Sequence, residues 1–143
     1  MDFFSAMEIL ASGLGAERVR MNLAASNLAN AQTTRTPAGG PYQRQDAVFT
    51  TESLPDNGQM DASFMEALQK VEVNDIAVDK SPPKSIYDPS HADADAKGYV
   101  SMPNVNAIEE MVNMMTASRS YEANITAMRS LLEMAERALG LGR

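Results

Sequence analysis

The sequence predicts a mainly α-helical fold with a small β-rich middle, in which long N- and C-terminal helices pair as a coiled-coil-like hairpin and an irregular β insertion lies between them. All seven prolines fall between Pro37 and Pro103, so both ends of the 143-residue chain are free to be helical. Aromatic residues make up only 6% of the chain while there are 11 methionines, which suits packing between helices better than a large β core. At both ends, apolar residues recur at alternating spacings of four and three, a pattern typical of a coiled-coil seam.

The N-terminal segment, residues 1–35, is predicted to form a helix from about Asp2 to Asn30. Positions spaced alternately by four and three carry apolar side chains, with Glu17 as the exception. The predicted seam consists of Phe3, Met7, Leu10, Leu14, Met21, Ala24 and Leu28. A run rich in proline and glycine over residues 37–41 breaks any helix that precedes it.

The middle segment, residues 36–103, is predicted to be a small β-rich module. Ala47–Thr51 is expected to form a strand, and Asp61–Lys70 a short helix or a turn. Over Val71–Val78 the alternation of apolar residues slips by one at residues 74–75, which predicts a bulge or tight turn between two strand pieces. The remaining expected elements are a break at Ser81–Lys84 and edge strands at Ser85–Tyr87 and Gly98–Val100.

The C-terminal segment, residues 104–143, is predicted to be one long helix. Its seam consists of Ala107, Met111, Met114, Tyr121, Ile125, Met128, Leu132, Ala135 and Leu139, with Ser118 as the exception. Asn104 or Asn106 is the expected N-cap, and Gly140 and Gly142 are expected stop signals. A second, shorter stripe beside the seam indicates that this helix touches more than one neighbour; it consists of Ile108, Val112 and Met115.

Two interpretations of the seams stay open. In the first, the two helices form an intramolecular hairpin that buries its own core. In the second, the helices pack between subunits, which is favoured because the long helices lie at opposite chain ends and the middle is too small to cover both. The N-terminal members Met7, Leu10, Leu14, Met21 and Leu28 are expected to pack against Met111, Met114, Ile125, Met128 and Leu132, within or between subunits.

Charge and composition exclude several classes of function. The formal net charge is -7 and the pI is about 4.6, which argues against binding to nucleic acid or to an anionic membrane surface, since both require a basic face. The absence of cysteine excludes disulfides, thiol nucleophiles and cysteine-based metal sites. No apolar run reaches the roughly 18 residues of a membrane span. The first residues lack the basic region typical of a cleaved signal peptide.

No motif predicts catalysis. A metal site could be proposed from His91, Asp93 and Asp95, but a neighbouring proline and the alternating alanines favour a polar turn instead. Gly13-Leu14-Gly15 lacks the third glycine of a dinucleotide-binding loop, and no strand precedes it. We therefore expect no catalytic residue, no cofactor, no metal and no small-molecule substrate.

The densest polar stretch, residues 25–37, lies where the first helix is expected to end. It holds the short amide side chains Asn27, Asn30 and Gln32, which can cap carbonyls or bond to neighbouring backbone. One interpretation is simple termination of the helix. The other is a polar contact between subunits, and both stay open.

The sequence Ala25-Ser26-Asn27-Leu28-Ala29-Asn30-Ala31-Gln32-Thr33-Thr34-Arg35-Thr36 resembles the N-terminal signature of bacterial flagellar rod, hook and axial proteins. Further segments are similar to members of this family that form the proximal rod, namely residues 37–42, 86–91, 98–100, 102–106, 109–111 and 117–124. The resemblance therefore spans nearly the whole chain in order.

The resemblance implies a structural subunit of the proximal rod, which polymerises through its terminal helices, transmits torque across the periplasm and encloses the export channel. It implies as partners other copies of the chain, other rod subunits, a rod-base adaptor and the flagellar type III export apparatus, which exports the chain without a cleaved signal peptide. A secreted or cytoplasmic coiled-coil adaptor or effector of a type III export system is the alternative. Asn27 and Asn30 are expected to set the register between subunits. The full expected assembly interface is Met7, Leu10, Leu14, Met21, Ser26, Asn27, Leu28, Asn30, Met111, Met114, Tyr121, Asn124, Ile125, Met128 and Leu132.

Overall fold

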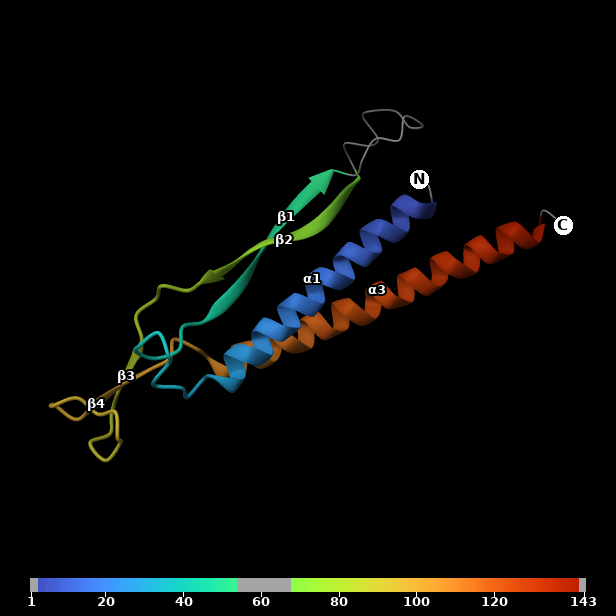
Figure 1. Ribbon diagram of the computed structural model, residues 1–143. Helices are drawn as coiled ribbons and strands as arrows, with labels where there is room; N and C mark the ends of the chain where they lie inside the picture. The colour runs from blue at the N-terminus through green and yellow to red at the C-terminus, as the bar shows by residue number, and fades with distance from the viewer. Residues whose placement is uncertain (1–2, 54–67, 142–143) are drawn as a thin grey trace. The chain divides into compact units, whose positions relative to one another are not determined.

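A computed structural model of the chain describes residues 3–53 and 68–141, which form two long helices and four strands (Figure 1). In chain order, the elements are α1 (Phe3–Ala29), β1 (Gln45–Ser53), β2 (Gln69–Val78), β3 (Lys84–Tyr87), β4 (Tyr99–Met102) and α3 (Ala107–Leu141). The described part of the chain is mainly helical with small sheets in the middle, as the sequence predicts. The functional division at residues 1–35, 36–103 and 104–143 stays a prediction.

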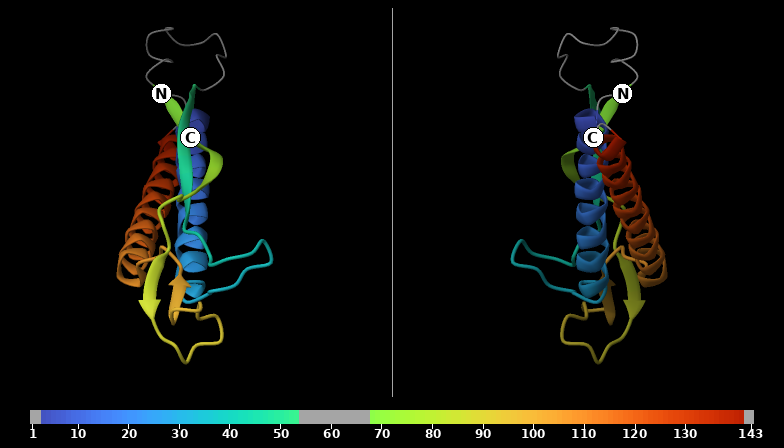
Figure 2. Two further views of the ribbon diagram at one scale, coloured as in Figure 1. Left: turned by 90° about the vertical axis from the view of Figure 1, so that its left-hand side faces the viewer. Right: turned by 90° about the vertical axis from the view of Figure 1, so that its right-hand side faces the viewer.

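The chain packs as two compact units. Of the described residues, the first unit comprises 3–19, 48–53, 68–75 and 116–141, and the second comprises 20–47 and 76–115. Within each unit, a portion of α1 lies beside a portion of α3 (Figure 2).

The N-terminal helix ends close to its predicted boundary, at Ala29, and Asp2 lies outside the described residues. The side chain of Asn30 closes this end, because its Nδ2 donates to the carbonyl of Ser26 at 2.9 Å and its Oδ1 accepts from the hydroxyl of Thr33 at 3.1 Å. The carbonyl of Ser26 also accepts from the backbone N–H of Asn30 at 3.0 Å, so the side chain of Asn30 adds a second hydrogen bond at the last turn of the helix.

The predicted strand Ala47–Thr51 lies within β1, which pairs with β2 in a two-stranded sheet whose strands run in opposite directions (Figure 1). The tight turn expected as one alternative at residues 74–75 is wrong, because β2 continues unbroken to Val78, while the other alternative, a bulge, stays a prediction. Residues 74–78 are all exposed, so no buried face requires the apolar alternation to stay in phase there. Of the expected helix or turn at Asp61–Lys70, residues 61–67 lie outside the described residues, and the last two residues begin β2.

The expected edge strands are confirmed as β3 and β4, which pair antiparallel with Ile86 opposite Val100 and Tyr87 opposite Tyr99. Val100 is almost fully buried. Gly98 precedes β4 with a φ of +82°, and a Cβ atom added there would lie 2.9 Å from the ring of Tyr87. Glycine is therefore required at this position by both conformation and space.

The C-terminal helix begins at Ala107, and Asn106 is its N-cap, since its Oδ1 accepts a hydrogen bond from the backbone N–H of Ile108 at 3.2 Å. The expected stop at Gly140 is wrong, because the helix continues through it to Leu141, while Gly142 lies outside the described residues. A glycine ends a helix when it adopts a left-handed conformation, and Gly140 keeps a negative φ.

Small residues, rather than the predicted row of large ones, are the most buried parts of the helices in the first unit. Ala16 and Ala117 are buried, and a Cβ atom added at Gly13 would lie 3.1 Å from Nδ2 of Asn124. Small side chains permit a short distance between helix axes. Of the predicted seam, Met111 and Leu132 are exposed within one chain, whereas the residues immediately before them are buried or half-buried. The packing of the seam within or between subunits stays a prediction.

Candidate functional site

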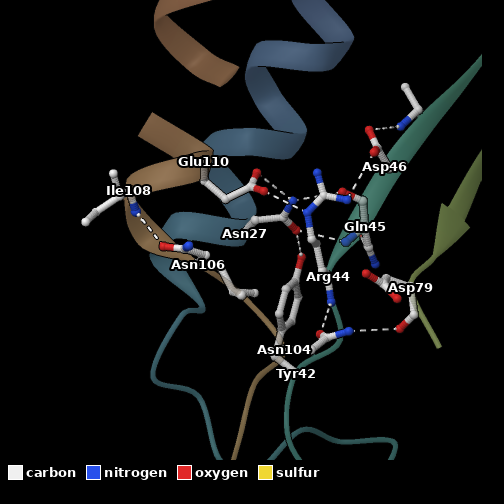
Figure 3. Close-up of polar contacts among 12 residues, drawn as sticks. Asn27, Tyr42, Arg44, Gln45, Asp46, Asp79, Asn104, Asn106, Ile108 and Glu110 are labelled. Carbon is white, nitrogen blue, oxygen red and sulfur yellow. Dashed lines mark hydrogen bonds and ion pairs between the residues drawn. The ribbon is translucent and has the colours of Figure 1, made fainter. Parts of the chain in front are cut away.

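The second unit contains a buried cluster of polar side chains, here called the polar junction (Figure 3). It connects the last turns of α1, the start of β1 and the first turn of α3. Its members are Asn27, Tyr42, Arg44, Gln45, Asn104 and Glu110.

Asn27 is 1% exposed and lies at the centre of the polar junction. Its Nδ2 donates to the backbone carbonyl of Gln45 at 2.8 Å and to Oε2 of Glu110 at 3.0 Å. Its Oδ1 accepts from the hydroxyl of Tyr42 at 2.9 Å and from the backbone N–H of Gln45 at 3.0 Å. All four hydrogen-bonding positions of the amide are thus used inside the chain.

Glu110 is 2% exposed and carries the buried charge of the polar junction. Its Oε1 accepts from Nε of Arg44 at 2.7 Å, and a second nitrogen of this guanidinium donates to Asp46 at 3.0 Å. Burial opposes the charge on the guanidinium, but the bonds to Glu110 and Asp46 outweigh this effect and raise the pKa of Arg44. The buried carboxylate of Glu110 and the partly exposed guanidinium of Arg44 therefore form an ion pair with satisfied hydrogen bonds, and removal of Arg44 alone would leave the Glu110 carboxylate buried without its partner.

The backbone around Arg44 is tied to the connection between the two sheets. Its N–H donates to Oδ1 of Asn104 at 2.8 Å, and its carbonyl accepts from the N–H of Asp79 at 2.8 Å. The amide nitrogen of Asn104 in turn donates to the carbonyl of Asp79 at 3.1 Å. One asparagine side chain thus joins the start of β1 to the residue that follows β2.

The structure gives different roles to the amides of the polar stretch at the end of α1. Asn30 terminates the helix, and Asn27 joins three segments of the same chain. The side chain of Asn27 is not accessible for a direct contact with another subunit, because it is buried and each of its hydrogen-bonding positions is occupied within the chain.

Several members of the polar junction carry no signal that identifies them in the sequence. Glu110 is recognisable only as an acid near the start of a helix, where it complements the helix dipole. Nothing in the sequence pattern around Arg44 or Asn104 marks them as partners of residues far away. Asn27 stands out in the sequence only as one of the short amides in the polar stretch at the end of α1.

The outward face of α3 in the second unit is an exposed apolar surface, here called the α3 patch. Its members are Ile108, Met111, Val112 and Met115, with exposed fractions of 72%, 45%, 56% and 54%. Residues three and four apart lie on one face of a helix, so these side chains form one continuous surface. The shorter stripe predicted beside the seam lies within the α3 patch.

The other residues of the expected assembly interface are distributed over both helices. On α1 and α3, the members that are half-buried are Met7, Leu10, Leu14, Met21, Ser26, Leu28, Met114, Tyr121, Asn124, Ile125 and Met128. Leu132 is exposed, like Met111. Each of these residues is half-buried or exposed and therefore has surface available for contact with a neighbouring subunit.

His91, Asp93 and Asp95, the residues considered for a metal site, lie in the second unit and form hydrogen bonds and an ion pair with other parts of the chain. Asp93 accepts a hydrogen bond from Thr34 at 2.7 Å and forms an ion pair with Arg35. The bond from Thr34, followed by the charge of Arg35, lowers the pKa of Asp93. Nδ1 of His91 accepts from the backbone of Asp93, and Asp95 accepts from two backbone N–H groups. Over residues 3–53 and 68–141, no group of three such side chains is arranged to hold a metal ion.

Comparison with known proteins identifies the class to which this fold belongs. A family model described as "Flagella basal body rod protein" matches residues 7–35, and one described as "Flagellar basal body rod FlgEFG protein C-terminal" matches residues 96–141. Both helices therefore carry family signatures. Within the described ranges, neither helix has an apolar stretch long enough to cross a bilayer.

Relatives match over their full length. The flagellar basal-body rod protein FlgC of Borreliella burgdorferi is 42% identical over 151 residues, covering 99% of this chain and 98% of the relative. The FlgC proteins of Salmonella typhimurium and Bacillus subtilis are 41% and 40% identical, each covering 100% of both chains.

These matches define a structural subunit of the bacterial flagellar basal-body rod, which assembles with other components of the basal body. The chain belongs to the FlgC family of rod proteins. The alternative of an adaptor or effector is not favoured.

Proposed function

We propose that this chain forms part of the wall of the proximal rod by packing the faces of its terminal helices against neighbouring subunits. The assembled rod then transmits torque across the periplasm and encloses the export channel. The observation that carries the proposal is the α3 patch, because an apolar surface of this kind marks a site of protein association. About half or more of each side chain in the α3 patch is exposed, so a neighbour that covers it contributes roughly 1 kcal/mol per side chain.

The polar junction supports this role by holding α1, β1 and the start of α3 in one arrangement. A neighbouring subunit then binds an α3 patch that is already formed, so the association does not include the free-energy cost of ordering the helix. Asn27 and Glu110 thereby contribute to assembly indirectly, through the shape of the subunit.

We propose as partners other copies of this chain, other proximal and distal rod subunits, a rod-base adaptor and the flagellar type III export apparatus. Export through a narrow channel requires an unfolded chain, and the chain contains no cysteine that could form a covalent cross-link against unfolding. The site chemistry supports a role without catalysis, since the polar groups of the junction are paired with one another.

A charge placed in the α3 patch tests the proposal. Val112→Asp in the bacterium that makes this chain is expected to lower the yield of rods at least tenfold, because a buried carboxylate at the interface would be unpaired. The matched control is Thr126→Asp, since Thr126 is also exposed and lies five helical turns from Ile108 on the same face, among polar residues. Normal rod yield and motility with Val112→Asp would contradict the proposal.

A further inference from the structure

The first unit has a pocket between α1 and α3 with a volume of about 180 Å³. Its lining residues are Ala11, Leu14, Gly15, Arg18 and Tyr121. An engineered apolar cavity of about 150 Å³ accommodates benzene, so this pocket has room for one apolar side chain. No atom lies within 4 Å of a Cβ built at Gly15, and the pocket is open because glycine has no side chain there.

The α3 patch carries side chains of the right kind to fill this pocket. Its two methionines are unbranched and flexible, and such side chains fill irregular gaps well. The charges beside the two surfaces are also complementary. Arg18 at the rim of the pocket is exposed, and so is Glu109, which lies next to Ile108 at the edge of the α3 patch.

We propose that the α3 patch of one copy packs over this pocket on a second copy, so that one methionine of the patch enters the pocket and Glu109 of the first copy faces Arg18 of the second. The inference rests on the proposed function and deepens it by naming the partner, a second copy of this chain. The pocket and the α3 patch are different surfaces, so the contact is heterologous and each copy offers both halves. A heterologous contact that does not close on itself propagates into a helical assembly, which is what a rod subunit requires.

Cross-linking tests the contact directly, because the chain has no cysteine of its own. The variant Gly15→Cys, Met111→Cys is produced at full length in the native host, basal bodies are isolated, and mild oxidation is applied. A disulfide requires Cα atoms within about 7 Å, so docking predicts a ladder of linked dimers and larger multimers. The control variant Gly15→Cys, Thr126→Cys is expected to give none. Normal rods whose cysteines at 15 and 111 link no more than in this control would overturn the proposal.

Filling the pocket provides an independent test. Gly15→Leu places a side chain in open space and replaces a glycine by a better helix former, so the circular dichroism of the purified chain is expected to show retained helix. Rod yield is expected to fall at least tenfold, with a smaller loss for Gly15→Ala. The matched control is Gly140→Leu, another helical glycine with open surroundings, which is expected to leave rods unchanged. Normal rods with Gly15→Leu would refute the docking.

Charge reversal separates this inference from the proposed function. Arg18→Glu alone is expected to lower rod yield several-fold, and adding Glu109→Arg in the same chain is expected to restore most of it. If Val112→Asp abolishes rods while pocket filling and charge reversal have no effect, the α3 patch serves a different partner and only this inference fails. If Val112→Asp is also harmless, the proposed function fails as well.

Discussion

The replacement Asn27→Ala removes the amide at the centre of the polar junction and is expected to lower the free energy of unfolding by about 3 kcal/mol. The largest contribution comes from Glu110, which is 2% exposed and loses a donor that water cannot replace, at a cost of about 1–3 kcal/mol. The other three hydrogen bonds end on partly buried groups of Tyr42 and Gln45, which can recover some hydration. Such a loss corresponds to roughly a hundredfold change in the ratio of folded to unfolded chain.

Urea unfolding of the purified full-length chain, followed by far-ultraviolet circular dichroism, measures this loss. The control is Asn22→Ala, because Asn22 is an exposed asparagine on the same helix and its removal is expected to change stability by less than about 0.5 kcal/mol. Asn27→Asp keeps the size of the side chain but places a second carboxylate beside Glu110, so it is expected to be at least as destabilising near neutral pH. Equal stabilities for Asn27→Ala and Asn22→Ala would refute the reasoning.

Three further predictions concern the second unit. Arg44→Leu alone is expected to cost about 3 kcal/mol because Glu110 keeps a buried charge without its partner, whereas the double replacement with Glu110→Leu is expected to cost clearly less, which a double-mutant cycle measures. The lowered pKa of Asp93 gives a stabilising contribution that is present above the ordinary aspartate pKa of about 3.9 and is lost as the pH falls through the folded value. The urea midpoint of unfolding is therefore expected to fall as the pH is lowered. It is expected to fall less in Thr34→Ala, which lacks the hydrogen bond that is the main cause of the lowered pKa. An equal dependence of the urea midpoint on pH in the two proteins would contradict this role of Thr34. Gly98→Ala is expected to cost about 2 kcal/mol in thermal unfolding, because its φ is +82° and the new Cβ would lie 2.9 Å from a tyrosine ring; unchanged stability would contradict this account.

The sequence pattern predicted the elements well where the signal is local. The positions of the prolines and the apolar spacing placed both helices within a residue or two of their described starts, and Asn106 was recognised as one of two candidate caps. The prediction from the sequence pattern failed at positions where the rest of the structure overrides a rule based on neighbouring residues. Gly140 did not end its helix, and the phase slip in β2 did not produce a turn, since no face of that part of the strand is buried.

The packing of the predicted seam stays a prediction, and the structure shows only which of its residues are buried within one chain. The spacing pattern counts large apolar side chains, so it selected Met111 and Leu132, which are exposed. The buried positions of α3, among its described residues, belong to Glu110 and Ala117, a polar residue and a small one. Two helices can approach closely where their side chains are small. A pattern that counts large apolar residues does not detect such positions.

The sequence by itself determined that the chain is helical at both ends, carries a small β-rich middle and belongs with the axial proteins of the flagellum, because periodicity, proline placement and signature segments are properties of neighbouring residues. Only the tertiary structure decided which polar groups meet and which apolar residues stay exposed. The carboxylate of Glu110 and the amide of Asn27 are separated by 83 positions in the chain, and Arg44 comes from a third segment. A buried polar side chain is stable only with its partners in place, and folding brings those partners together from segments whose local sequences are independent of one another.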